Sequence, residues 1–347
     1  MDWGFNSLLL VCDLMALVML AKNRSWPWGL AVLCVTGIAA GGLAIYFARG
    51  VSFVLARYLA WGLFLHGSIM LIGVAVLLFG RSFRFAVASL TAGLLLIGIG
   101  IDAFWIEPEW LEVTTVEIES DEINNPIRIA IVADFQTDKI GEYERRAIEE
   151  VFSREPDLVL FAGDYLQTKS GDQLELSKQL GELFQAVTHR PPLGVYAVQG
   201  NTDYGLWHVP FEQLDAAIFQ RTQSIETGEL TVTGLGMRDS FNTRLVVPSK
   251  DGFHIVLGHS PNFALGENDA DLLVAGHTHG GQVQLPLIGP LLTLSHVPRD
   301  WASDVTDIGD GRTLIVSRGV GRERKGAPQM RFLCRPQIVI VELKPSR

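Results

Sequence analysis

The sequence has few cysteines and fewer basic than acidic residues. The first shortage bears on disulfide bonds and the second on nucleic-acid binding. Only three cysteines occur in 347 residues: Cys12 and Cys34 lie in an apolar N-terminal region, and Cys334 is alone in the remainder. A disulfide within that remainder is therefore excluded. Lys and Arg number 28 against 38 Asp and Glu, which gives a net charge of −10. Because an acidic chain is a poor electrostatic partner for a nucleic-acid backbone, we expect no nucleic-acid partner.

Two other features are missing from the sequence. The first apolar stretch has neither a basic segment before it nor a small-residue cleavage site, so we expect no cleaved signal peptide. Internal repeats, low-complexity segments and an obvious linker after Trp110 are also missing. The length therefore suits a membrane region followed by one sizeable α/β domain.

The sequence does have long apolar runs at its N-terminal end. The chain is 48% hydrophobic with a mean hydropathy of +0.26, and residues 1–106 account for most of this. Apolar stretches cover about 5–21, 28–47, 53–79 and 85–105. A helix needs about 20 apolar residues to cross a membrane, so residues 1–106 are predicted to form a transmembrane region of about four helices. The first stretch is the weakest of the four, because it is short and contains Asn6 and Asp13.

Basic residues between the stretches predict an orientation. The first and third connections carry four of them and the second carries two; they are Lys22, Arg24, Arg81 and Arg84 against Arg49 and Arg57. The positive-inside rule places the first and third connections in the cytoplasm. We therefore expect a multi-pass protein of the inner (plasma) membrane, with everything after Trp105 on the extracytoplasmic side.

Two ionisable residues, Asp13 and His66, fall inside the apolar stretches. Intramembrane ionisable groups are functional candidates by default. Since no transporter-like repeat accompanies them, we expect a structural role instead. His66 should be hydrogen-bonded within the helical bundle, and Asp13 should lie on the marginal first span.

From Leu111 onward, strand-like and helix-like segments alternate, which predicts an α/β domain with a largely parallel sheet over residues 111–347. The expected strands are Leu111–Ile123, Ile127–Ala133, Leu158–Ala162, Val195–Val198, Leu230–Leu235, His254–Leu257, Leu272–Ala275, Thr313–Val316 and Ile338–Leu343. The expected helices are Glu142–Phe152 and Gln173–Val187.

Five of these strands end in side chains that can bind metals. They lead into Asp134-Phe135-Gln136, Gly163-Asp164, Gly200-Asn201-Thr202-Asp203, Gly258-His259 and Gly276-His277-Thr278-His279. Each alone has a simpler explanation as a helix cap, a turn or a surface histidine. Because ligands bind at the carboxyl ends of strands in α/β sheets, we expect the five to meet. Mixed Asp, Asn and His donors suit two Mn, Fe or Zn ions bridged by a carboxylate.

In its order and spacing, this series resembles the calcineurin-like metallophosphoesterases, and in particular their bacterial membrane-associated branch. The resemblance covers about residues 111–347 and implies a two-sheet α/β sandwich flanked by helices, with a dinuclear metal centre. One metal would be held by Asp134, Gln136, Asp164 and His279, and the other by Asp164, Asn201, His259 and His277. Asp164 would bridge the two ions.

Two residues depart from the family pattern. Gln136 replaces a histidine and is a weaker donor, so the first site should either be looser or prefer a harder ion such as Mn. Thr202 replaces the histidine that neutralises the transition state or protonates the leaving oxygen in the family. Losing a general acid typically costs about 10²–10⁴-fold in rate. Asp203, Tyr204 or His208 could substitute, or the substrate could be a phosphoanhydride, which needs no proton.

The sequence therefore predicts metal-assisted phosphoester hydrolysis with Asp164, Asn201, Asp203 and His208 as catalytic residues. Arg322, Arg324 and Lys325 are candidates for contact with a substrate phosphate or lipid headgroup, against the alternative of a solvated basic loop. Tethering by four spans favours a lipid-linked phosphate or pyrophosphate over another phosphorylated small molecule. Two alternatives are a catalytically weakened metal- and phosphate-binding sensor, and a working membrane bundle with an accessory phosphoesterase domain.

Overall fold

The computed structural model describes residues 3–168 and 173–346 and contains two compact units. One unit comprises the chain up to Ile106 together with Lys325–Gln329. The other comprises Glu107–Arg324 and the chain from Met330 onward. Each unit has apolar cores of its own.

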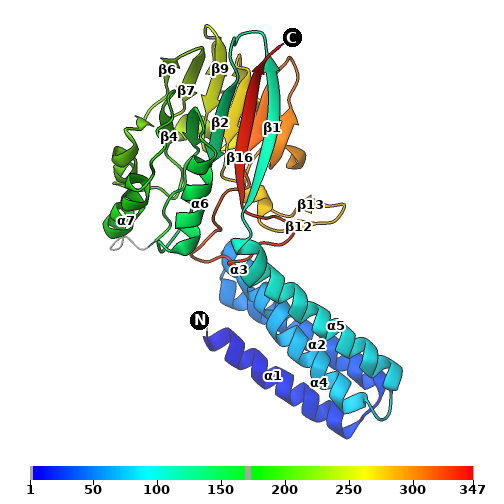
Figure 1. The fold of residues 1–347 in the computed structure, drawn as a ribbon. Coiled ribbons are helices and arrows are strands. Elements are labelled where there is room, and N and C mark those ends of the chain that lie inside the picture. Colours follow the sequence, from blue (N-terminus) through cyan, green and yellow to red (C-terminus); the bar gives the residue numbers. More distant parts are fainter. Residues whose placement is uncertain (1–2, 169–172, 347) are drawn as a thin grey trace. The chain divides into compact units, whose positions relative to one another are not determined.

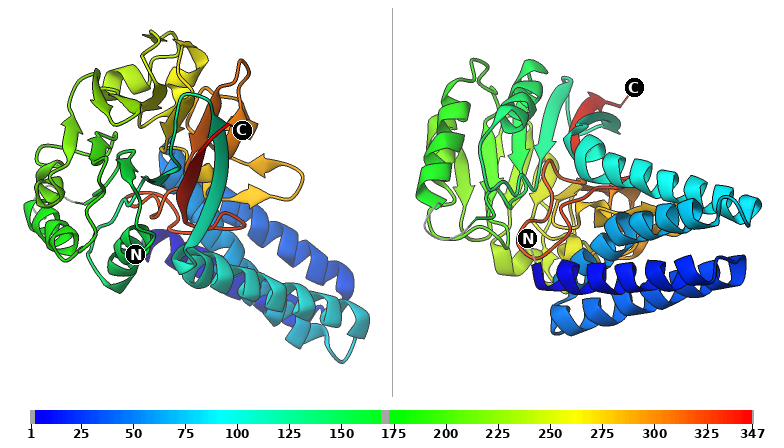
Figure 2. Two further views of the ribbon diagram at one scale, coloured as in Figure 1. Left: turned by 45° about the horizontal axis from the view of Figure 1, so that its top comes forward. Right: turned by 90° about the horizontal axis from the view of Figure 1, so that it is seen from below.

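The first unit consists of four helical spans, each long and apolar enough to cross a membrane. They are α1 (Trp3–Lys22), α2 (Trp26–Ala48), a continuous third span made of α3 (Ser52–Trp61), a π-helical segment (Gly62–Gly67) and α4 (Ser68–Leu78), and α5 (Phe83–Ile101), which continues as a π-helical segment to Ile106. The spans lie side by side (Figure 2). Many large apolar side chains of these helices are exposed, which is typical of surfaces that face lipid. The unit is consistent with membrane association.

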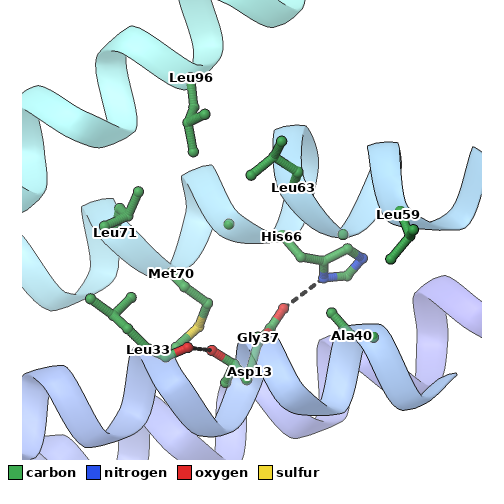
Figure 3. A pocket seen from close by; sticks show the side chains of 14 residues that line it. Asp13, Leu33, Gly37, Ala40, Leu59, Leu63, His66, Met70, Leu71 and Leu96 are labelled. Atoms are coloured by element: carbon green, nitrogen blue, oxygen red, sulfur yellow. Dashed lines mark hydrogen bonds and ion pairs between the residues drawn. The ribbon is translucent and has the colours of Figure 1, made fainter. Parts of the chain in front are cut away.

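A buried polar cluster joins α1 to the third span (Figure 3). Nδ1 of His66 lies 2.6 Å from Oδ2 of Asp13, and its Nε2 lies 3.2 Å from Oδ1 of Asn6. Asp13 and His66 are 1% and 4% exposed and line a cavity of about 390 Å³, together with small residues such as Gly37 and Ala40. The expectation that His66 is hydrogen-bonded within the bundle is confirmed.

The second unit contains two six-stranded sheets. The strands of the first sheet are ordered β1 (Glu112–Ser120), β16 (Gln337–Pro345), β2 (Ile127–Val132), β3 (Leu158–Phe161), β4 (Val195–Val198) and β5 (Ala217–Phe219). All its neighbours are parallel except β16 and β2. The long strands β1 and β16 stand side by side in Figure 1.

The strands of the second sheet are ordered β14 (Asp304–Asp307), β15 (Thr313–Val316), β11 (Leu272–Ala275), β9 (Phe253–Leu257), β7 (Leu230–Gly234) and β6 (Gln223–Thr227). Only its two outer pairs are antiparallel. Two short ribbons complete the unit: β8 (Val246–Val247) with β10 (Glu267–Asn268), and β12 (Gln284–Leu285) with β13 (Gly289–Pro290).

The main core of this unit lies between the two sheets. It combines Ile129 and Leu160 of the first sheet with Ile255 and Val274 of the second. The alternate side chains of the first sheet, such as Val132 and Phe161, pack against α6 (Glu142–Ser153) and α7 (Gln173–Gln185). Burial on both faces explains why β2, β3 and β4 are continuous apolar runs. The predicted two-sheet α/β sandwich flanked by helices is confirmed.

The sequence analysis was less accurate at the edges of the sheets. The strand expected over Leu111–Ile123 ends at Ser120, where the chain turns. The edge strands β5, β6 and β14 were not predicted, because they are short or mostly polar on exposed faces. The short helix α8 (Met237–Ser240) was also missed.

Candidate metal centre

The predicted metal ligands follow the carboxyl ends of five strands, three in the first sheet and two in the second. Asp134, Asp164 and Asn201 follow β2, β3 and β4, while His259 follows β9 and His277 and His279 follow β11. The structure brings ligand atoms of Asp134, Asp164 and His259 within 4.8 Å of one another, and all three residues are buried. Nε2 of His259 lies 3.5 Å from Oδ2 of Asp164. Two carboxylates and an imidazole thus converge where the two sheets meet.

Three further predicted ligands contact this group. Oδ1 of Asn201 lies 3.0 Å from Nε2 of His259, and Nε2 of Gln136 donates to Oδ2 of Asp164 at 3.0 Å. The ring centroid of His277 lies 5.1 Å from that of His259. The backbone N–H of His277 also donates to Oδ2 of Asp134 at 2.9 Å. The motifs after β2 and β11 are therefore joined directly.

His279 is buried beside the cluster, and neither of its ring nitrogens has a hydrogen-bond partner in the described part of the chain. The same holds for Oε1 of Gln136 and for Oγ of Thr202. Buried polar atoms of native proteins are normally paired, so each of these atoms requires an explanation. Imidazole nitrogens and a carboxamide oxygen beside buried carboxylates are the donors that a divalent cation takes. The donor set therefore fits a metal centre.

The backbone at the site lies in a region that side-chain-bearing residues rarely adopt. Left-handed φ angles occur at Asp134 (52°), Gln136 (37°), Asp164 (57°), His277 (71°) and His279 (50°). Such conformations cost about 1–3 kcal/mol each and cluster at functional sites, where the surrounding fold enforces them. Five of the seven predicted ligands are therefore held at the expense of stability.

A glycine allows the β4 motif to approach Asp164 closely. A Cβ atom on Gly200 would lie 2.2 Å from Oδ1 of Asp164, which no side chain could accommodate. This closeness lets the backbone N–H of Thr202 donate to the same oxygen at 2.7 Å. The glycine before Asn201 is thus required by the position of the Asp164 carboxylate.

The electrostatics of the cluster favour a cation. Burial, together with the nearby Asp164 carboxylate, raises the pKa of Asp134 well above its usual value, and the opposing effect of His259 does not offset this. Burial lowers the pKa of His259, but the Asp164 carboxylate outweighs burial and raises it to about 9. Burial lowers the pKa of His277 to about 4 and that of His279 well below its usual value. His277 and His279 are therefore neutral, which is the protonation state that metal binding requires of an imidazole.

The residues predicted to supply a proton, Asp203, Tyr204 and His208, have surroundings that differ from those of the predicted metal ligands. The Asp203 carboxylate accepts the backbone N–H groups of Gly200, Asp164 and Tyr165, each at 2.8 Å. Both of its oxygens are thus occupied in holding the β3 and β4 motifs together. Tyr204 is 60% exposed, and His208 packs beside Trp207. Neither Asp203 nor His208 belongs to the group formed by Asp134, Asp164 and His259 in the described part of the chain.

The basic loop after β15 is only partly solvated. Nε of Arg324 donates to the Gln136 carbonyl at 3.0 Å, and its Nη1 lies 3.3 Å from Asp138. Arg322 is half-buried, and burial lowers the pKa of its guanidinium. Lys325 is exposed and belongs to the helical unit.

Two residues that the sequence analysis did not consider, Glu323 and Gln167, extend the contacts of Gln136. Oε2 of Glu323 is 3.3 Å from Nε2 of Gln136, and Oε1 of Glu323 accepts from Nε2 of Gln167 at 2.6 Å. The signal available in the sequence was a single acid within the basic run Arg322–Lys325. Gln167 lies three residues after Asp164 in the sequence, and no feature of the sequence there indicates a role at the site.

Comparison with known proteins defines the class to which this site belongs. Residues 127–281 match the calcineurin-like phosphoesterase family. This span includes all seven predicted metal ligands. Residues 127–281 therefore form a calcineurin-like phosphoesterase domain, as the resemblance predicted, and relatives named metallophosphoesterases support a phosphoric ester hydrolase.

Three relatives illustrate the match. The uncharacterized metallophosphoesterase YkuE of Bacillus subtilis is 27% identical over 283 residues, covering 74% of this chain and 94% of the relative. The phosphodiesterase YaeI of Escherichia coli is 26% identical over 256 residues, covering 69% and 90%. A Danio rerio protein named a transmembrane protein with metallophosphoesterase domain is 25% identical over 295 residues, covering 76% and 64%.

Proposed function

We propose that this chain is a membrane-anchored phosphoesterase that hydrolyses a phosphodiester or pyrophosphate of a lipid-linked substrate at a dinuclear metal centre. In this proposal residues 1–106 anchor the protein and residues 111–347 form the catalytic domain. The two ions are Mn, Fe or Zn. The substrate class rests on the spans, since a tethered site meets its substrate at the membrane surface.

One observation carries the proposal: two buried carboxylates and an imidazole, Asp134, Asp164 and His259, have ligand atoms within 4.8 Å of one another. Burying two carboxylates without a compensating cation is costly, and buried charges in proteins are paired or coordinate metals. Asn201, His277 and the other predicted ligands surround this group with further donors.

When bound, two divalent ions supply an activated water and neutralise charge on the phosphoryl oxygens. The chain itself supplies the geometry. Asp164 lies between the two predicted ligand sets, with Gln136 at one of its oxygens and Thr202 N–H at the other. Thr202 provides no imidazole for the leaving oxygen, and Asp203 is occupied by backbone N–H groups. This arrangement suits substrates with good leaving groups, such as pyrophosphates and activated diesters.

The proposed location is the inner (plasma) membrane with the catalytic domain on its extracytoplasmic side. Four apolar spans support multi-pass insertion, and the excess of basic residues in the first and third connections supports the orientation. A relative named a transmembrane protein with metallophosphoesterase domain supports the combination of spans with this domain.

Hydrolysis by the full chain purified in detergent with Mn tests the proposal. The substrates are pyrophosphate, an activated phosphodiester, an activated phosphomonoester and a polyprenyl pyrophosphate in mixed micelles. We expect turnover of the diester or a pyrophosphate, and we expect Asp164→Asn to abolish it while the exposed control Asp251→Ala retains it. Mn binding without turnover of any substrate would favour the sensor alternative, and activity that survives Asp164→Asn would place the reaction elsewhere.

A further inference from the structure

The carboxamide of Gln136 occupies a position between two carboxylates. Its Nε2 lies 3.0 Å from Oδ2 of Asp164 and 3.3 Å from Oε2 of Glu323, while its Oε1 is buried without a hydrogen-bond partner among the residues described. The two ends of a carboxamide have the same shape, so a half-turn about its last bond exchanges them. After that half-turn, the carboxamide oxygen of Gln136 takes the place of Nε2, beside Oδ2 of Asp164 and Oε2 of Glu323.

The fold holds Glu323 in this place. Its Oε1 accepts from Nε2 of Gln167, and its backbone N–H donates to Oε1 of Gln282 at 3.0 Å. Gln167 is buried, and its own Oε1 accepts the backbone N–H of Arg324 at 2.5 Å. One oxygen of Glu323 is therefore fixed by the protein, and the other points to Gln136.

The loop that carries Glu323 is also built to lie close to the β2 motif. The backbone N–H of Gly321 donates to the Asp134 carbonyl at 2.7 Å, and a Cβ atom on Gly321 would lie 1.9 Å from the Phe135 carbonyl oxygen. Only glycine permits this approach. Arg324 secures the other end of the segment through the Gln136 carbonyl.

We propose that Glu323 is a ligand of the first metal ion and compensates for the glutamine that stands in place of the family's histidine. The inference rests on the proposed dinuclear function. The donor set of that ion then comprises oxygens of Asp134, Gln136, Asp164 and Glu323 with one nitrogen from His279. Anionic oxygen donors favour hard ions, so this site should bind Mn or Mg in preference to Zn. Gln167 acts as a positioning residue that orients Glu323.

Metal titration of the full chain in detergent tests this without relying on activity. Metal-free protein is titrated with Mn, and free Mn is followed by electron paramagnetic resonance. We expect two bound Mn per wild-type chain. Glu323→Ala and the near-isosteric Glu323→Gln should weaken one of the two about tenfold to a hundredfold, while the exposed control Glu226→Ala should not. Gln167→Leu should weaken the same ion by a smaller factor.

A second arm separates a ligand from a residue that merely positions Gln136. In the background Gln136→His, an imidazole supplies the missing donor, so Glu323→Gln should cost clearly less Mn affinity than it costs with Gln136 present. The affinity of the first site for Zn relative to Mn should also rise. Circular dichroism spectra that match the wild type confirm that the variants fold.

Three results would overturn the inference. Two Mn bound with unchanged affinity in both Glu323 variants would show that Glu323 is not a ligand, while leaving the proposed function intact. If Glu323→Gln lowered the Mn affinity equally with Gln136 present and in the Gln136→His background, Glu323 would be a structural contact and not a metal ligand. Fewer than one Mn bound by the wild-type chain would remove the dinuclear centre itself, and with it both proposals.

Discussion

Replacing Asp203 by alanine distinguishes a structural from a chemical role for a residue that the motif suggested was catalytic. Its carboxylate accepts three buried backbone N–H groups, each at 2.8 Å. Leaving one buried donor unpaired costs about 1–3 kcal/mol, so the sum is about 3–9 kcal/mol. Because the loops can relax and admit water, we expect about 3–5 kcal/mol for Asp203→Ala. At about 2–4 °C per kcal/mol, the phosphoesterase domain should melt roughly 10 °C lower.

The effect of Asp203→Ala should also be local. Hydrogen exchange of the amides of Asp164, Tyr165 and Gly200 should accelerate, because these three N–H groups lose their acceptor. Asp203→Asn, which keeps one oxygen, should give a smaller effect, and the exposed control Asp251→Ala none. Unchanged melting and unchanged exchange together with lost hydrolysis would refute the reasoning and make Asp203 a participant in the chemistry.

Three further predictions follow from other parts of the chain. Thr202→His should accelerate hydrolysis of esters with poor leaving groups by about 10²-fold and change that of pyrophosphate little; equal slowing of all substrates in steady-state assays would contradict this. Arg331 is fully buried and donates to the carbonyls of Gly321, Arg318 and Cys334, so Arg331→Met should destabilise the domain by at least about 3 kcal/mol, measured by thermal melting. Reporter fusions should place the loop of Arg81 and Arg84 in the cytoplasm and the C-terminus outside; a C-terminal fusion active only in the cytoplasm would reverse the orientation.

The predicted metal ligands could be grouped from the sequence because each follows a short apolar strand, and five of the seven lie next to a glycine. Parallel strand ends converge by topology, so Asp134, Asp164 and His259 could be grouped without coordinates. The arrangement within the group could not be predicted in the same way. The sequence of Gly200–Asp203 looks the same whether the Asp203 carboxylate faces a metal or three backbone N–H groups.

Glu323 could not be predicted for a different reason. It lies 187 residues from Gln136 in the sequence, on a loop without regular secondary structure. Its neighbours are arginines, which suggested a basic surface and not a ligand. The close approach at Gly321 helps to bring this loop to the β2 motif, and a glycine in a loop carries no information about what it approaches.

The pair formed by Asp13 and His66 has a consequence for how the protein is made. An aspartate at the centre of an isolated span costs about 2.5–3.5 kcal/mol to insert. Its partner lies 53 residues later, on the third span. At about 5–20 residues per second, the ribosome needs about 3–10 s to supply that partner. Under the proposed multi-pass insertion, we therefore expect the first span to enter the lipid together with the third, so that the bundle is assembled as a group and not one helix at a time.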